Sequence, residues 1–119
     1  PLKEDFRGLA ASLREKLEPD HVLAFAGGDL GDWYPGATYT CVMRYLYPSP
    51  APAVVMTRPA DESLLRSLED KRTVWMLWGS QNPTAGAYLP GWHVVSKERI
   101  PRIANLVKFE RDDPTTQPR

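Results

Sequence analysis

Sulfur and histidine are scarce in this chain. Among its 119 residues there is one cysteine, Cys41, and there are two histidines, His21 and His93. One cysteine excludes a disulfide within the chain, and the spacing of these residues fits no recognised metal site. Cys41 lies in an apolar run, which is typical of a small buried hydrophobe. We therefore expect a domain that folds without a disulfide, a metal or a cofactor.

Net charge is absent as well. Lys and Arg together number 15, as do Asp and Glu, so the formal net charge is zero. Proteins that bind nucleic acid by neutralising phosphates usually carry a basic excess, so nucleic acid is the less favoured partner. The apolar runs are far shorter than the roughly 18 residues of a membrane span, and no signal-peptide pattern is present. These absences predict an intracellular, cytoplasmic protein with no membrane partner.

Proline and aromatic side chains are abundant, with 12 prolines, four tryptophans and five tyrosines. Prolines break helices and central strands, so the fold should consist of short elements. The clearest of these is a helix over residues 2–18, which Pro19 ends. Its apolar residues recur at helical spacing and predict one buried stripe, made of Leu2, Phe6, Leu9, Leu13 and Leu17.

Short apolar runs predict buried strands, and they cover residues 21–26, 53–57 and 73–78. Another strand is expected over residues 37–47, where Tyr, Cys and Met alternate with Thr, Val and Arg. The last strand, over residues 87–95, is interrupted by a turn at Pro90-Gly91.

Two further helices are expected. Residues 57–71 have Pro59 in a first turn and Asp61 beside it, which suits the positive end of a helix dipole. Ser96 is a candidate cap for a final helix, whose apolar face would consist of Ile100, Ile103 and Val107. The expected order is α-β-β-β-α-β-β-α.

These elements predict one compact α+β domain over residues 1–110, followed by a polar tail over residues 111–119. Its core should be a single mixed or mostly antiparallel sheet of about five strands, with helices packed on it.

The run α-β-β-β-α-β resembles the core of the PD-(D/E)xK nuclease superfamily. That family binds Mg²⁺ through an acid near its second strand and a (D/E)-x-K motif on its third. Here Asp29 and Asp32 precede the second expected strand, whereas the third has no acid and is followed by Arg58. An alternative function is therefore a nucleic-acid-processing hydrolase or nuclease-like domain. Its candidate residues are Asp29, Asp32 and His93, provided that their loops meet at one end of the sheet.

Residues 22–39, "VLAFAGGDLGDWYPGATY", resemble the strand–turn–strand hairpins of Tudor-type chromatin readers. Those readers bind methylated lysine or arginine in a cage of aromatic rings, through cation–π attraction. The resemblance implies an aromatic-cage reader as a further alternative, with Trp33 and Tyr34 as cage candidates.

The aromatic residues exceed what about five short strands need for packing. Trp and Tyr are favoured at the centres of protein interfaces. We therefore expect a small non-enzymatic protein-interaction module, of the inhibitor, immunity, assembly or accessory type. Its partner should be another protein, with self-association as a further expectation. The candidate binding surface consists of Trp33, Tyr34, Trp78, Tyr88 and Trp92.

Overall fold

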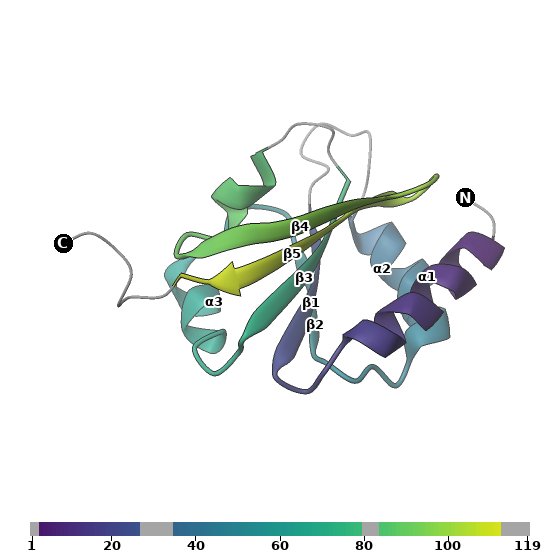
Figure 1. Cartoon of the computed structure of the whole chain (residues 1–119), viewed down its shortest axis with the longest axis horizontal. Helices are drawn as coiled ribbons and strands as arrows, with labels where there is room; N and C mark the ends of the chain where they lie inside the picture. Colours follow the sequence, from purple (N-terminus) through teal and green to yellow (C-terminus); the bar gives the residue numbers. More distant parts are fainter. Residues whose placement is uncertain (1–2, 27–34, 80–83, 113–119) are drawn as a thin grey trace.

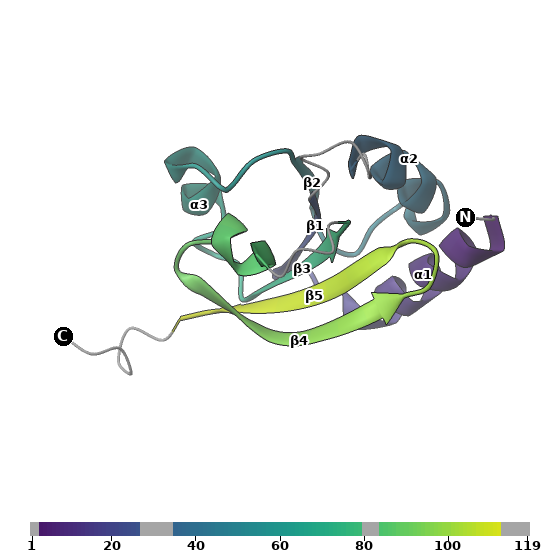
Figure 2. The same ribbon diagram turned by 90° about the horizontal axis from the view of Figure 1, so that it is seen from above.

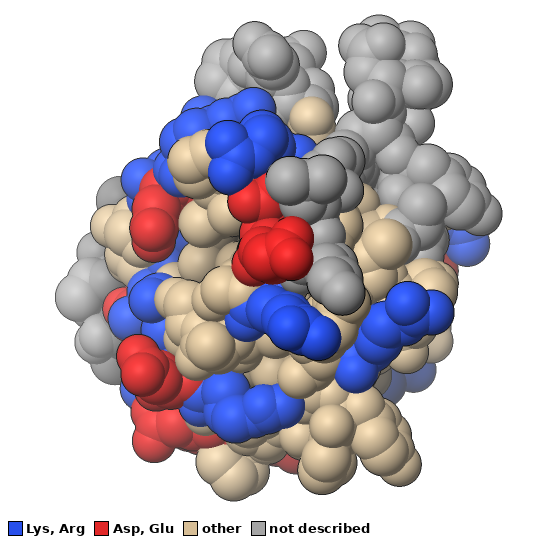
Figure 3. All heavy atoms as spheres, turned by 90° about the vertical axis from the view of Figure 1, so that its right-hand side faces the viewer, with Lys and Arg blue, Asp and Glu red and all other residues tan. Residues whose placement is uncertain are grey.

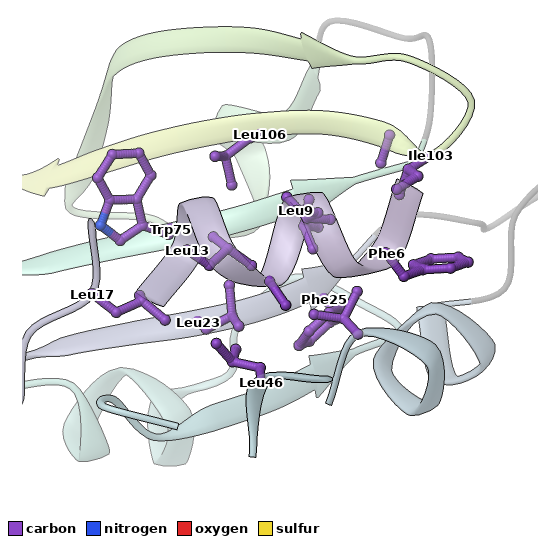
Figure 4. Close-up of a cluster of buried hydrophobic side chains, with 14 of the residues drawn as sticks. Phe6, Leu9, Leu13, Leu17, Leu23, Phe25, Leu46, Trp75, Ile103 and Leu106 are labelled. Carbon is purple, nitrogen blue, oxygen red and sulfur yellow. The ribbon is translucent and has the colours of Figure 1, made fainter. Parts of the chain in front are cut away.

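The leucine stripe near the start of the chain forms a helix, as its spacing predicts. In the computed structural model, which describes residues 3–26, 35–79 and 84–112, helix α1 spans Lys3–Lys16. Leu9 and Leu13 of α1 are buried and point toward the sheet (Figure 4). Acidic residues lie in its first turn and basic residues in its last, which is the favourable arrangement for the helix dipole.

The apolar runs form a single mixed sheet of five strands in the order β2-β1-β3-β5-β4. The first three of these strands run parallel to one another, and β5 and β4 are antiparallel to their neighbours. This arrangement confirms the expected fold class. The strands are β1 (His21–Ala26), β2 (Ala53–Met56), β3 (Thr73–Trp78), β4 (Trp92–Ile100) and β5 (Ala104–Arg111).

Helices cover both faces of the sheet. Helices α1 and α2 (Pro35–Leu46) lie side by side on one face, where they enclose a core cluster with Leu23, Phe25 and Leu106 (Figures 1 and 4). Helix α3 (Glu62–Ser67) and the short 3₁₀ helix η1 (Thr84–Tyr88) contribute to a second cluster on the opposite face (Figure 2). We call these cluster 1 and cluster 2. The central strands β1 and β3 are buried on both faces.

The expected strand over residues 37–47 is wrong, because these residues belong to α2. Since β1 and β2 are parallel neighbours, the chain between them must cross over one face of the sheet, and a helix is the usual connection. The fully buried α2 residues Val42 and Leu46 lie four apart, with Thr38 one further turn back. The same segment therefore contains both a helical spacing of buried residues and an alternation of residue types that favour strands.

The expected final helix is also wrong. Residues 92–111 form the β4–β5 hairpin, whose turn contains Arg102 in the left-handed region at φ 66°. The turn is held to α1, because the Arg102 guanidinium donates to both carboxylate oxygens of Asp5 at 2.7 and 3.1 Å. Ile103, expected on a helix face, is buried in cluster 1 at the end of the turn, just before β5.

The first of these corrections, the helix α2, also bears on both family resemblances. Residues 35–46 form a helix where the nuclease core requires its second strand and where the reader hairpin requires its return strand. At the end of the described residues, β5 includes Arg111, and the Asp112 amide donates to the Gly91 carbonyl at 3.0 Å.

Alanine substitutions at two glycines that have free space around them can test the backbone conformation of this fold. A Cβ added at Gly8, within α1, or at Gly91, before β4, meets nothing within 4 Å, but only Gly91 has a positive φ, at +88°. Gly8→Ala should raise the free energy of unfolding by about 1 kcal/mol, through helix propensity. Gly91→Ala should lower it by about 1 kcal/mol or more, because alanine is strained there.

Urea unfolding of the two variants beside the wild-type protein measures both changes. The substitution is chemically the same at each site, so each variant controls for the other. Shifts of the same sign would contradict the backbone conformation described for these positions.

Candidate functional site

The tryptophan and tyrosine candidates fall into two groups. Trp33 and Tyr34 lie outside the described residues. Trp78, Tyr88 and Trp92 are only 2, 8 and 7% exposed and belong to cluster 2, so the expectation that these three form an exposed aromatic surface is wrong. The reason is η1, which brings Tyr88 edge-on against Trp78 with their ring centroids 4.7 Å apart.

The candidates for hydrolysis are not brought together by the described residues. Asp29 and Asp32 lie outside them; along the chain they follow Ala26, the last residue of β1. His93 is aligned through Glu110 and Thr73 with the first residues of the parallel strands, whereas Ala26 is paired with the last residue of β3. Five residue steps of strand, about 17 Å, separate these two ends of the sheet.

His93 instead has a partner that the sequence did not indicate. Its Nδ1 lies 2.8 Å from Oδ1 of Asp112, and its side chain is half exposed. Asp112 had been assigned to the polar tail. The hydrogen bond fixes the orientation of the imidazole ring and leaves Nε2 on the far side of the ring from the carboxylate.

A groove of about 360 Å³ lies between α3 and the start of β4. Trp92 forms part of its lining, and the Arg111 guanidinium lies 4.6 Å from the centroid of the Trp92 ring. This groove, named here the α3–β4 groove, is lined by Glu62, Leu65, Arg66, Glu69, Pro90, Gly91, Trp92 and Arg111. Its lining thus combines an aromatic ring and apolar side chains with charges of both signs.

Arg111 fixes the two walls of the α3–β4 groove relative to each other. Its Nη2 donates to the carbonyl of Leu68, just after α3, and to the carbonyl of Lys71 at 2.8 Å. Leu68 is the C-cap of α3, where a guanidinium is a suitable donor for a helix carbonyl, and Lys71 lies three residues beyond it. Arg111 belongs to the segment for which the sequence predicts a polar tail, and nothing in its local pattern indicates this role.

An apolar strip continues from the groove along β4. Val94 and Val95 are 44 and 42% exposed, and both are among the large hydrophobic residues that contact solvent. A bulge between Val94 and Ser96 makes Val95 an extra residue with no partner in β5. We call Val94 and Val95 the valine strip; it lies at the outer edge of the sheet, because β4 is the last strand.

A polar cluster surrounds the other histidine, at the start of β1. His21 is 3% exposed, and its Nδ1 accepts hydrogen bonds from Trp75 Nε1 at 3.2 Å and from the Glu18 amide at 3.3 Å. Its Nε2 lies 3.0 Å from Nη2 of Arg72, and 3.6 and 3.9 Å from carboxylate oxygens of Glu18 and Asp20. Arg72 is held by the same two carboxylates. The cluster closes one end of the sheet.

Burial lowers the pKa of His21, and the positive charge of Arg72 lowers it further. Glu18 and Asp20 act in the opposite direction, and Lys108 adds a smaller lowering effect. The balance keeps the buried imidazole neutral, in agreement with its accepting two hydrogen bonds. This histidine is a structural residue at a strand end, as is usual for a lone histidine.

Comparisons with known proteins found no protein similar to this chain. No protein-family model matches it, and neither the curated proteins nor the solved structures contain a match. Within residues 3–26, 35–79 and 84–112, no group of three or more His, Cys, Asp or Glu residues is arranged to hold a metal ion. In the same part of the chain, no helix is long and apolar enough to cross a membrane.

The lowered pKa of His21 predicts a loss of stability in mild acid. Between pH 7.5 and 5.5 the unfolded chain takes up a proton at this histidine near its ordinary pKa of about 6.5, while the folded chain, with its lowered pKa, takes up less. The free energy of unfolding should therefore fall as the pH falls through this range. His21→Asn, which keeps an acceptor and cannot titrate, should reduce the slope.

Urea unfolding at several pH values above 5 measures both slopes. This range avoids Asp20, whose pKa is lowered from 3.8, chiefly by the hydrogen bond from Arg72. Equal slopes for the wild-type protein and His21→Asn would show that His21 does not control the stability in this range.

Proposed function

We propose that this chain is a non-enzymatic protein-interaction domain, and that its contact surface consists of the α3–β4 groove and the valine strip. The proposal keeps the class of function that the sequence suggested and moves the surface. Of the aromatic residues first considered, Trp92 belongs to the new surface, as part of the groove lining. Trp78 and Tyr88 are core residues.

The observation that carries the proposal is the position of two exposed valines directly after a groove lined by tryptophan. Val94 lies two residues beyond Trp92, and their β5 partners, Phe109 and Arg111, alternate with Glu110. Val94 and Trp92 therefore lie on the same face of the sheet, about 7 Å apart along the strand. An apolar centre with tryptophan and arginine, and a rim of mixed charge, is the composition of a protein interface.

Charge supports a protein partner in preference to nucleic acid. In the groove Glu62 and Arg66 form an ion pair of 3.3 Å, and Arg111 is occupied by backbone carbonyls. At the other end of the molecule, where α1 and α2 lie (Figure 3), basic side chains also lie beside acidic and neutral ones. A surface that binds phosphates would instead concentrate unpaired positive charge.

The surface can be tested by cross-linking followed by a binding measurement. A photo-reactive amino acid at position 94 should capture a partner in the native source, and mass spectrometry identifies it. For the purified partner, Val94→Glu/Val95→Glu should weaken binding at least tenfold, about 1.4 kcal/mol, because both valines would be desolvated in the complex.

Val55→Glu is the matched control. Val55 is 38% exposed on β2, the strand at the opposite edge of the sheet, and its substitution should leave the affinity within about twofold. Equal affinities for the wild-type protein and Val94→Glu/Val95→Glu, with the fold intact, would exclude this surface.

A further inference from the structure

The second half of β4 has a pattern of charge that differs between its two faces. Lys97 and Arg99 are paired with Val107 and Asn105 of β5, whereas Glu98 is paired with Leu106. Val107 belongs to cluster 2 and Leu106 to cluster 1. Paired residues share a face of a sheet, so two positive charges lie on the cluster 2 side and one negative charge lies on the other.

These three charged side chains are exposed, and none has an ion-pair partner among the residues that the structure describes. The outer edge of β4 has no neighbouring strand in the sheet. Val94 is paired with Phe109, also of cluster 2. One face of this edge therefore presents, in order, Val94, Lys97 and Arg99, which the bulge at Val95 brings into line.

The same charges disfavour pairing between two copies of the chain. In an antiparallel pair of β4 strands, registers centred on this half place Lys97 opposite Lys97 or Arg99 of the second copy, or Glu98 opposite Glu98. Like charges directly opposite each other destabilise a pair of strands, and charged side chains and bulges are common protection for sheet edges. The edge is therefore selective: it rejects a second copy and leaves room for a strand of complementary charge.

We propose that the partner contributes an extended segment of another protein, which adds as an antiparallel strand to the outer edge of β4. Acidic side chains of this segment lie opposite Arg99 and Lys97, a basic side chain between them lies opposite Glu98, and an apolar side chain lies opposite Val94. Read along the segment, this pattern is acidic, basic, acidic, any residue, apolar. The inference rests on the proposed function and identifies the chemistry of its partner.

Backbone pairing supplies affinity in such complexes, and the alternating side chains supply specificity. The adjoining α3–β4 groove then lies beyond Val94, where residues that continue the segment reach Trp92. The apolar end of the segment is thus directed to the groove and its acidic end to the hairpin turn.

Two labelled synthetic peptides test the inference by fluorescence anisotropy. One contains Glu-Lys-Glu-Thr-Val and the other Lys-Glu-Lys-Thr-Val, with identical flanking residues. The first should bind the wild-type chain about tenfold more tightly, because three cross-strand charge pairs change sign between the peptides. Lys97→Glu/Arg99→Glu should reverse the preference, and added salt should reduce it.

Arg58→Glu is the control for a change of charge alone, since Arg58 is an exposed arginine outside β4, 80% exposed at its side chain. It should leave the preference for the first peptide unchanged. Amide hydrogen exchange should also slow at β4 when that peptide is bound, and should not slow at the β2 edge.

Equal affinity for the two peptides, no binding of either up to millimolar concentration, or an unaltered preference in Lys97→Glu/Arg99→Glu would overturn the inference. A dimer in sedimentation that these substitutions abolish would overturn it too, in favour of a second copy. The two proposals can fail separately: if Val94→Glu/Val95→Glu weakens binding of the cross-linked partner and the charge substitutions do not, the interaction surface stands and the charge-matched strand is wrong.

Discussion

The pairing of β1 with β3 is the constraint on which the rest of this domain depends. The two strands are parallel and in register over six residue pairs, from His21 with Thr73 to Ala26 with Trp78, and every residue in them is buried. Parallel neighbours cannot be joined by a tight turn. The chain therefore leaves β1 to form α2 and β2, and returns through α3 to β3. Because these helices lie on opposite faces, the sheet is covered on both sides.

Much of this fold could be predicted because its signals are local. The stripe of Leu9 and Leu13 repeats at helical spacing, and the runs that became β1, β2 and β3 are short, apolar and bounded by prolines, glycines or charges. The helix α2 was misjudged because its residue types favour strands, although the spacing of Val42 and Leu46 is helical. These residues are helical because they connect the parallel strands β1 and β2, and the preferences of single residues carry no information about that pairing.

The hairpin was missed for a related reason. The spacing of Ile100, Ile103 and Val107 fits a helix as well as it fits two strands on either side of a turn. Which of the two forms depends on Arg102 adopting a left-handed conformation.

The candidate site was harder to predict than the fold. The alternation of residues along a strand shows on which face of the sheet a side chain lies. It does not show whether a helix covers that face, so the sequence could not distinguish the buried Trp78 from the exposed Val94. That β4 is an edge strand follows from the order of the sheet alone.

The position of β5 has a consequence for how the domain is made. The last strand of the described residues, β5, lies between β3 and β4, so β4 has no strand to pair with in the sheet until β5 is in place. Arg111, the final residue of β5, is also the one that ties the sheet to the end of α3. The groove and the edge beside it are thus complete only once β5 has joined the sheet. A nascent or truncated chain that lacks β5 would not display the surface that a finished domain presents.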